Sequence, residues 1–171
     1  MQERADIITM KGTPLTLVGD VPIIDQAAPD FTVVANNLAP VSLADFRQKI
    51  VVIVSVPSLD TSVCDIETRR FNQEAAALGD AVRILVISMD LPFAQQRWCG
   101  AAGIERVQTL SDHRDASFGL AYGVLIKELR LLARAIFIVD QHGYLRYRQI
   151  VPEVANEPDY AAVLQQLAQL Q

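Results

Sequence analysis

The sequence predicts an α/β fold, a single domain over residues 1–171 in which helices flank a mixed β-sheet, with a β-hairpin extension over residues 1 to about 40. Three observations lead to this prediction. The length of 171 residues suits one domain, because two separate cores would each be small. Two nearly continuous β-branched runs, KIVVIVSVP (49–57) and VRILVISM (82–89), are typical of strands buried on both faces. The residues between them follow a helical pattern, which makes a strand–helix–strand unit with an expected right-handed crossover.

The segments before the first buried run are expected to be short. Residues 5–20 predict a hairpin, because apolar residues stand on both sides of the turn cluster KGTP at 11–14. Residues 31–35 could form a further strand, and Ser42 is placed to cap a short helix that begins LADF.

The helix between the two buried runs is predicted from its ends and its apolar stripe. Asp60 or Thr61 is the candidate N-cap, and Gly79 is the candidate stop. Spacings of 7, 4 and 3 place four apolar residues on one helical stripe: Cys64, Phe71, Ala75 and Leu78.

The second half of the chain continues the same alternation. Asp90 as N-cap and Pro92 in the first turn predict a second helix, which two glycines weaken and end at 100 and 103. A short strand at 107–110 and a short helix at 115–122 are expected next. Residues 131–140 and 144–151 predict an antiparallel hairpin, and 158–170 a closing helix. This order of elements fits a thioredoxin-like arrangement.

Composition excludes several classes of protein. Apolar residues make up 51% of the chain, which rules out wholesale disorder. A net charge of −5 argues against non-specific nucleic-acid binding, which needs clustered cations. No apolar run approaches the roughly 20 residues of a membrane span. The first ten residues contain no apolar signal-peptide region, so a cytoplasmic location is expected.

Two cysteines, Cys64 and Cys99, are the residues most able to carry chemistry. A chain with two separated cysteines and no CxxC usually holds two buried, inert thiols. Cys64, however, begins a helix directly after a buried strand, where unpaired N–H groups and the helix dipole favour a thiolate. Pro57 stiffens the loop before it, and Thr61 supplies a hydroxyl three residues earlier. Position alone leaves both interpretations open: a nucleophile, or a small core residue with Thr61 as a simple N-cap.

Two further residues are ambiguous on the same grounds. Arg134 stands at the start of an apolar strand, ARAIFIVD, where it is either solvated or extended across the sheet edge to the Cys64 thiolate. Cys99 lies near the glycine-rich end of the second helix, in RWCGAAG. A lone cysteine there is usually structural, although a helix end that can unwind suits a thiol that must move.

At this point the chain resembles a known family. The segment PSLDTSVC contains the PxxxTxxC pattern of the peroxiredoxins, with Pro57, Thr61 and Cys64 in place. The stretches SLDTSVCDIETRRFNQEA and DLPFAQQRWCGAAGIERVQTLSD are similar to the atypical two-cysteine thiol peroxidase branch. The segments TMKGTPLTLVGD, ARAIFIVD and VPEVANEPDY also resemble that branch. The resemblance runs from about Asp6 to Ala162, and the combination of PxxxTxxC with LPFAQxRxC is strongly specific.

The resemblance implies a peroxiredoxin sandwich and a thiol-dependent peroxidase. Cys64 would be the peroxidatic cysteine and Cys99 the resolving one, with Pro57, Thr61 and Arg134 completing the site. It further implies hydroperoxide substrates, with alkyl hydroperoxides favoured, and a Cys64–Cys99 disulfide, expected within one chain, that thioredoxin reduces. A homodimer is implied, and no metal or organic cofactor is needed.

Three other functions compete with this one. A metal-binding module would use Cys64, Cys99, His113 and His142, but their spacings of 35, 14 and 29 match no common zinc pattern. A non-catalytic thioredoxin-like interaction domain would be favoured by loss of Pro57, Thr61 or Arg134, and all three are present. A Cys–His hydrolase would need a histidine beside Cys64, and the sequence does not place one there.

Overall fold

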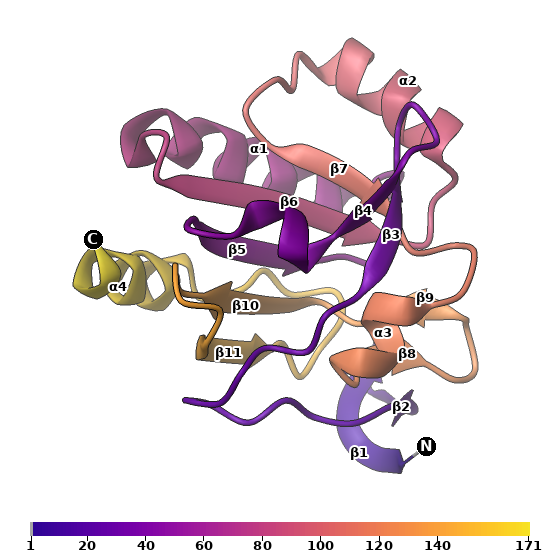
Figure 1. Cartoon of the computed structure of the whole chain (residues 1–171). Helices are drawn as coiled ribbons and strands as arrows, with labels where there is room; N and C mark the ends of the chain where they lie inside the picture. Colours follow the sequence, from indigo (N-terminus) through magenta and orange to yellow (C-terminus); the bar gives the residue numbers. More distant parts are fainter. Residues whose placement is uncertain (1) are drawn as a thin grey trace.

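The structure, a computed structural model, describes residues 2–171 and contains two β-sheets with helices around them (Figure 1). The larger sheet has seven strands in the order β11-β10-β5-β6-β7-β3-β4. Its strands are β3 (Thr32–Ala35), β4 (Pro40–Ser42), β5 (Ile50–Ser55), β6 (Val82–Ser88), β7 (Gln108–Ser111), β10 (Ala135–Val139) and β11 (Leu145–Ile150). The helices are α1 (Ser62–Leu78), α2 (Pro92–Ala102), α3 (Ser117–Ala121) and α4 (Tyr160–Leu170), with a 3-10 turn over Leu43–Phe46. The predicted mixed sheet with flanking helices is therefore confirmed.

The centre of the large sheet is the predicted strand–helix–strand unit. β5 and β6 are parallel, in a register that runs from Ile50 opposite Val82 to Ser55 opposite Ile87. All six residues of β5 are buried, as its β-branched sequence predicts. Because side chains alternate along a strand, Val52 and Val54 pack into one core with α1 and α4, whereas Val51 and Ile53 pack into another. The second core holds a cluster of aromatic rings: Phe31, Phe118, Tyr122 and Phe137.

The predicted N-terminal hairpin is present, and it forms part of a second sheet. It consists of β1 (Glu3–Met10) and β2 (Thr13–Val18), which join β8 (Leu125–Ile126) and β9 (Leu131–Leu132) in the order β1-β2-β8-β9. The hairpin meets α3 at close range. Gly19 has φ +113°, and a Cβ there would lie 2.2 Å from the carbonyl oxygen of Leu120, so this position requires glycine.

The predicted antiparallel hairpin of 131–140 and 144–151 is confirmed by the pairing of β10 with β11, but its first arm is wrong as a single strand, because 131–140 contains two strands in different sheets. Residues 131–132 pair with β8, and the chain then crosses to pair with β5 from Ala135 onward. The crossing consists of Ala133 and Arg134, both fully buried. Arg134 therefore precedes β10 at the junction of the two sheets.

The expected N-cap of the second helix is also wrong. Leu91 is the N-cap residue of α2, with Pro92 in the first turn as predicted and Gly103, at φ 66°, as C-cap. The Asp90 carboxylate is occupied elsewhere, because it accepts hydrogen bonds from Ser58 Oγ at 2.7 Å and from the Leu59 backbone at 2.8 Å. Asp90 thus ties the end of β6 to the loop that precedes α1. Among the helices of residues 2–171, none has both the length and the apolar character that a membrane crossing requires.

Candidate functional site

The candidate site is built around Cys64, the third residue of α1. The loop 56–61 leads from the end of β5 into this helix, so the thiol lies at the carboxyl edge of the sheet, where α/β folds place their sites. The side chain is fully buried in the core between the sheet, α1 and α4. The first turn of α1 also directs unpaired backbone N–H groups toward this end of the helix, which favours an anion there.

Thr61 places its hydroxyl on the sulfur of Cys64. Thr61 is the N-cap residue of α1 in position, yet its side chain makes no capping bond to the helix backbone. Its Oγ1 lies 2.8 Å from Cys64 Sγ and 2.9 Å from the carbonyl oxygen of Ser58. A hydroxyl has one hydrogen, so it donates to Ser58 when the thiol is protonated and donates to sulfur when the thiolate is present. The position of the Thr61 hydroxyl therefore fits both the thiol and the thiolate form of Cys64.

Arg134 reaches the same sulfur from the junction of the two sheets. Its side chain is 1% exposed, which excludes the solvated alternative for this arginine. The pairing of Ala135 with Ser55 sets the start of β10 beside the end of β5, next to the loop that leads to Cys64. Nη2 donates to Cys64 Sγ at 3.4 Å, and Nε and Nη2 donate to the carbonyl oxygen of Val154 at 3.2 and 3.0 Å.

Glu67 is a buried carboxylate of the site that sequence reasoning missed. It lies one turn after Cys64 on α1, is 0% exposed, and accepts a hydrogen bond from Arg134 Nη1 through Oε2. Its Oε1 has no hydrogen-bond partner within residues 2–171. The available signal was the spacing of three from Cys64, which puts both side chains on one helix face, beside an arginine that needed a partner.

The charges of Glu67 and Arg134 respond differently to burial. Burial raises the pKa of Glu67 to about 7, and the attraction of Arg134 offsets this only in part. Burial alone would lower the pKa of Arg134, but Glu67 and Cys64 together raise it. The pKa of Arg134 and the pKa of Glu67 are both raised, because the arginine has two acidic neighbours that outweigh its burial, whereas the single basic neighbour of the glutamate does not. The guanidinium is therefore the fixed charge of the site, and the carboxyl is the group that titrates.

The structure does not bring Cys99 to Cys64. Both thiols are free, and Cys99 is half-buried with its Sγ 3.3 Å from Thr109 Oγ1. The two cysteine-bearing helices are instead joined through the neighbours of the cysteines. Trp98 Nε1 donates to Asp65 Oδ1 at 3.1 Å, so the residue before Cys99 binds the residue after Cys64.

A second residue strengthens the contact between α1 and α2. Arg69 donates from Nε to Asp65 at 2.9 Å and from Nη1 to the carbonyl oxygen of Ala102 at 3.1 Å. Its guanidinium also lies 5.9 Å from the centre of the Trp98 ring. We call Asp65, Arg69 and Trp98 the helix latch, because they hold the end of α2 against α1 in this state.

The remaining candidate residues lie outside this cluster of contacts. Pro57 is buried directly after β5, at the start of the loop that carries Thr61. The His113 ring is 2.8 Å from Ser111 Oγ, and His142 occupies the turn between β10 and β11. Neither ring is a hydrogen-bond partner of a cysteine within residues 2–171. The same residues hold no group of three His, Cys, Asp or Glu side chains that could bind a metal.

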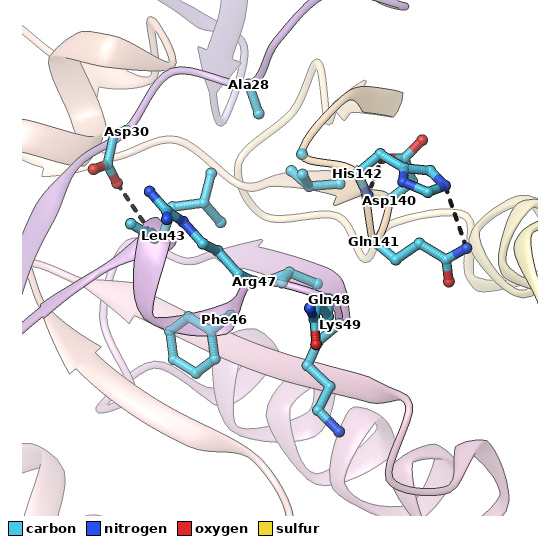
Figure 2. Close-up of a pocket in the computed structure, with 14 residues that line it drawn as sticks. Ala28, Asp30, Leu43, Phe46, Arg47, Gln48, Lys49, Asp140, Gln141 and His142 are labelled. Atoms are coloured by element: carbon cyan, nitrogen blue, oxygen red, sulfur yellow. Dashed lines mark hydrogen bonds between the residues drawn. The ribbon is translucent and has the colours of Figure 1, made fainter.

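Two cavities differ in their relation to the site. One of about 350 Å³ opens beside Thr61 and is lined by Leu59, Asp60, Thr61, Ser62, Asp65 and Trp98, so it connects the candidate site with the helix latch. A second, of about 440 Å³, lies between the 3-10 turn and the β10–β11 turn, where Figure 2 shows Arg47, Lys49 and His142 around it. This cavity is at the start of β5, the opposite end from Cys64.

The chain is similar to known proteins over nearly its whole length. The family model described as Redoxin matches residues 24–164. A thiol peroxidase of Bacillus subtilis (strain 168) is 58% identical over 153 residues, which covers 90% of this chain and 91% of that protein. A thiol peroxidase of Oceanobacillus iheyensis is 56% identical over 160 residues, covering 94% and 97%.

Solved structures agree with these relatives. The crystal structure of a peroxiredoxin-like protein from Aquifex aeolicus superimposes with a TM-score of 0.91 at 40% identity, covering 98% of both chains. A thiol peroxidase from Chromobacterium violaceum gives a TM-score of 0.84 at 22% identity, covering 95% of both chains, which supports the fold alone. The predicted thioredoxin-like sandwich is thereby confirmed.

Proposed function

The chain belongs to the redoxin family and to the thiol peroxidases within it, and from this premise we propose that its peroxidase reaction runs through Cys64. The observation that carries the proposal is the pair of donors on the Cys64 sulfur, Thr61 Oγ1 at 2.8 Å and Arg134 Nη2 at 3.4 Å. Both groups can donate a hydrogen bond to a Cys64 thiolate, which is the nucleophile in cysteine chemistry.

In the first step the Cys64 thiolate attacks the terminal oxygen of a hydroperoxide. A sulfur–oxygen bond forms, the oxygen–oxygen bond breaks, and the leaving alkoxide, or hydroxide when the substrate is hydrogen peroxide, takes up a proton to become an alcohol or water. Sulfur is oxidised to a sulfenic acid, and the peroxide is reduced. We propose alkyl hydroperoxides and hydrogen peroxide as substrates, entering through the cavity beside Thr61.

The two hydrogen-bond donors on the Cys64 sulfur can also stabilise the transition state of this step. Negative charge moves from sulfur to the leaving oxygen as the bond stretches, and donors that bind this developing charge more strongly than the ground state accelerate the step. Arg134 can follow the charge because its guanidinium carries several N–H groups in one plane. Thr61 can orient the peroxide through its hydroxyl, and Pro57 shields the sulfur from water.

In the second step Cys99 resolves the sulfenic acid. Its sulfur attacks Cys64, the oxygen leaves as water, and a Cys64–Cys99 disulfide forms. The Cα atoms of a disulfide lie within about 7 Å, and the two free thiols lie on different helices that the helix latch holds together, so we propose that at least one helix end unwinds in each cycle. The two glycines at 100 and 103 lower the cost of unwinding α2.

The cycle closes when an external dithiol reduces the disulfide, and we propose thioredoxin as this reductant. A cycle that depends on a reducing dithiol fits the cytoplasm, where such reductants keep thiols reduced. We further propose a homodimer as the working form. No step of the cycle requires a metal or an organic cofactor.

The test is peroxide consumption by cysteine variants in a thioredoxin-coupled assay. Cys64→Ser should abolish turnover, because a hydroxyl at this position does not form a comparable nucleophilic anion. Cys99→Ser should consume about one equivalent of peroxide and then stop as a sulfenic acid. Turnover by Cys64→Ser would overturn the assignment of the reacting thiol.

The route of the disulfide is tested separately. Cys99 is 35 residues from Cys64 and lies on the next helix of the same chain, so the bond should close within one chain. Peroxide-treated protein should migrate as a monomer of altered mobility on a non-reducing denaturing gel. A predominantly covalent dimer would show that resolution occurs between subunits.

A further inference from the structure

The tip of the N-terminal hairpin is attached to the segment 152–155, which follows β11. Glu153 accepts hydrogen bonds from Thr9 Oγ1 at 2.8 Å and from the backbone N–H groups of Lys11 and Gly12 at 3.0 and 3.2 Å. The backbones of the two segments also pair, because Thr9 N donates to Pro152 O at 2.7 Å and Val154 N donates to Thr9 O at 2.9 Å. One carboxylate thus closes the turn of the hairpin onto a loop more than 140 residues later in the chain.

The same segment holds the guanidinium of Arg134. The carbonyl oxygen of Val154, next to Glu153, accepts from both Nε and Nη2 of Arg134. Nη2 is also the nitrogen that donates to Cys64 Sγ. The Val154 carbonyl is therefore the acceptor that aims this nitrogen at the sulfur, while Glu67 holds the other nitrogen, Nη1.

These contacts form an unbroken series from the hairpin to the sulfur. We propose that Glu153 is a positioning residue for the peroxidase site: by fastening the hairpin tip to residues 152–155, it fixes the Val154 carbonyl and, through it, the Arg134 nitrogen that binds the Cys64 thiolate. The hairpin is in this view a working part of the active site as well as a cover for the second core. The inference deepens the proposed function and rests on the role of Cys64 given there.

The ionisation state and hydrogen bonds of Glu153 suit a residue that holds two segments of the chain together. Its hydrogen bonds, with the Thr9 hydroxyl first among them, lower the pKa of Glu153 to about 2, so the carboxylate stays ionised at neutral pH. A carboxylate that accepts several N–H and O–H donors sets the geometry of all of them, because each charge-assisted bond is directional and strong. A loop tethered in this way holds its carbonyl groups in one orientation.

The direction in which the titration of Cys64 moves distinguishes a positioning role of Glu153 from a direct effect of its charge. Removing a carboxylate near a thiolate favours the thiolate by Coulomb's law, and this would move the titration of Cys64 to lower pH. Loosening the Val154 carbonyl, in contrast, weakens the Arg134 donor and moves the titration to higher pH. A residue that only stabilises the fold would leave the titration where it is.

The experiment titrates the thiolate of Cys64 by its ultraviolet absorbance in a Cys99→Ser background, where Cys64 is the sole thiol. Glu153→Gln should move the midpoint to higher pH and lower the thiolate fraction on the acidic side by about three- to tenfold. Thr9→Val, which keeps the charge of Glu153 and removes its shortest bond, should move the midpoint in the same direction, and Thr9→Ser should restore it. The rate of the first peroxide turnover should fall in parallel.

The matched control is Glu128→Gln. Glu128 also anchors the hairpin by its carboxylate, which accepts from Thr16 N at 3.1 and 3.0 Å, but it does so within β2 and makes no hydrogen bond to residues 152–155 among residues 2–171. This variant should leave the thiolate titration unchanged. Equal shifts in Glu128→Gln and Glu153→Gln, no shift in Glu153→Gln, or a shift to lower pH would each overturn the proposal. The titration needs no peroxide, so these outcomes are independent of whether the wild-type protein passes the peroxidase test.

Discussion

Replacing Glu67 by glutamine should change how the stability of the protein depends on pH. The side chain is fully buried, and burial raises its pKa from 4.5 to about 7. Between these two values the folded protein binds the proton of Glu67 more tightly than the unfolded chain does. The contribution to stability is therefore fully present below about pH 4.5 and is lost as pH rises toward about 7.

The size of this effect follows from the interval between the two pKa values. Each unit corresponds to about 1.4 kcal/mol at 25 °C, so ionisation of Glu67 removes at most roughly 3 to 4 kcal/mol of the free energy of unfolding across the window. Glutamine has nearly the same shape and does not titrate. The Glu67→Gln protein should lose less stability than the wild type over this range, whatever its absolute stability.

Urea unfolding at a series of pH values from about 4 to 8 measures the difference between the two proteins. Burial also raises the pKa of Asp112, to about 6, but Asp112 titrates in both proteins and cancels in that difference. Glu74→Gln is the matched control, since Glu74 is a partly exposed carboxylate on the same helix and should leave the slope unchanged. Parallel curves for the wild type and Glu67→Gln would refute the reasoning, because they would show that the carboxyl does not titrate in this window.

Three other changes test the site and the fold. Arg134→Met should slow the reduction of peroxide by roughly 2–4 kcal/mol of barrier, about 30- to 900-fold in stopped-flow rates, since a charge-assisted donor is lost from the sulfur and the leaving oxygen; an unchanged rate would make this arginine structural. Oxidation should change the fluorescence of Trp98, the only tryptophan, because unwinding at either the start of α1 or the end of α2 breaks its bond to Asp65, and equal spectra before and after oxidation would contradict this unwinding. Gly19→Ala should lower the free energy of unfolding by about 2 kcal/mol or more, because its Cβ would strike a backbone carbonyl, whereas Gly12→Ala, with open space around it, should cost about 1 kcal/mol. Denaturant unfolding compares the last two, and equal losses would contradict the predicted clash.

Local patterns were sufficient for the central elements of the fold and for the position of Cys64. The β-branched runs became β5 and β6, the turn cluster at 11–14 became the tip of a hairpin, and the helix between the runs began beside Thr61. Each of these features depends on residues that are neighbours in the chain: the period of apolar side chains, a capping residue, a glycine or proline. The family resemblance then named the residues of the site, although their roles stay predictions until they are measured.

The tertiary structure decided the surroundings of the sulfur, because they are assembled from distant parts of the chain. Glu67 and Arg134 are 67 residues apart, and they meet only because β10 pairs with β5 in a register that sets the start of one beside the end of the other. The same crossing between sheets split the expected strand and buried the arginine. Asp90, predicted as a helix cap, instead binds the loop before α1. The sequence determines which groups carry charge and hydrogen bonds, whereas the strand register and the packing of the two sheets determine which of those groups share one buried space.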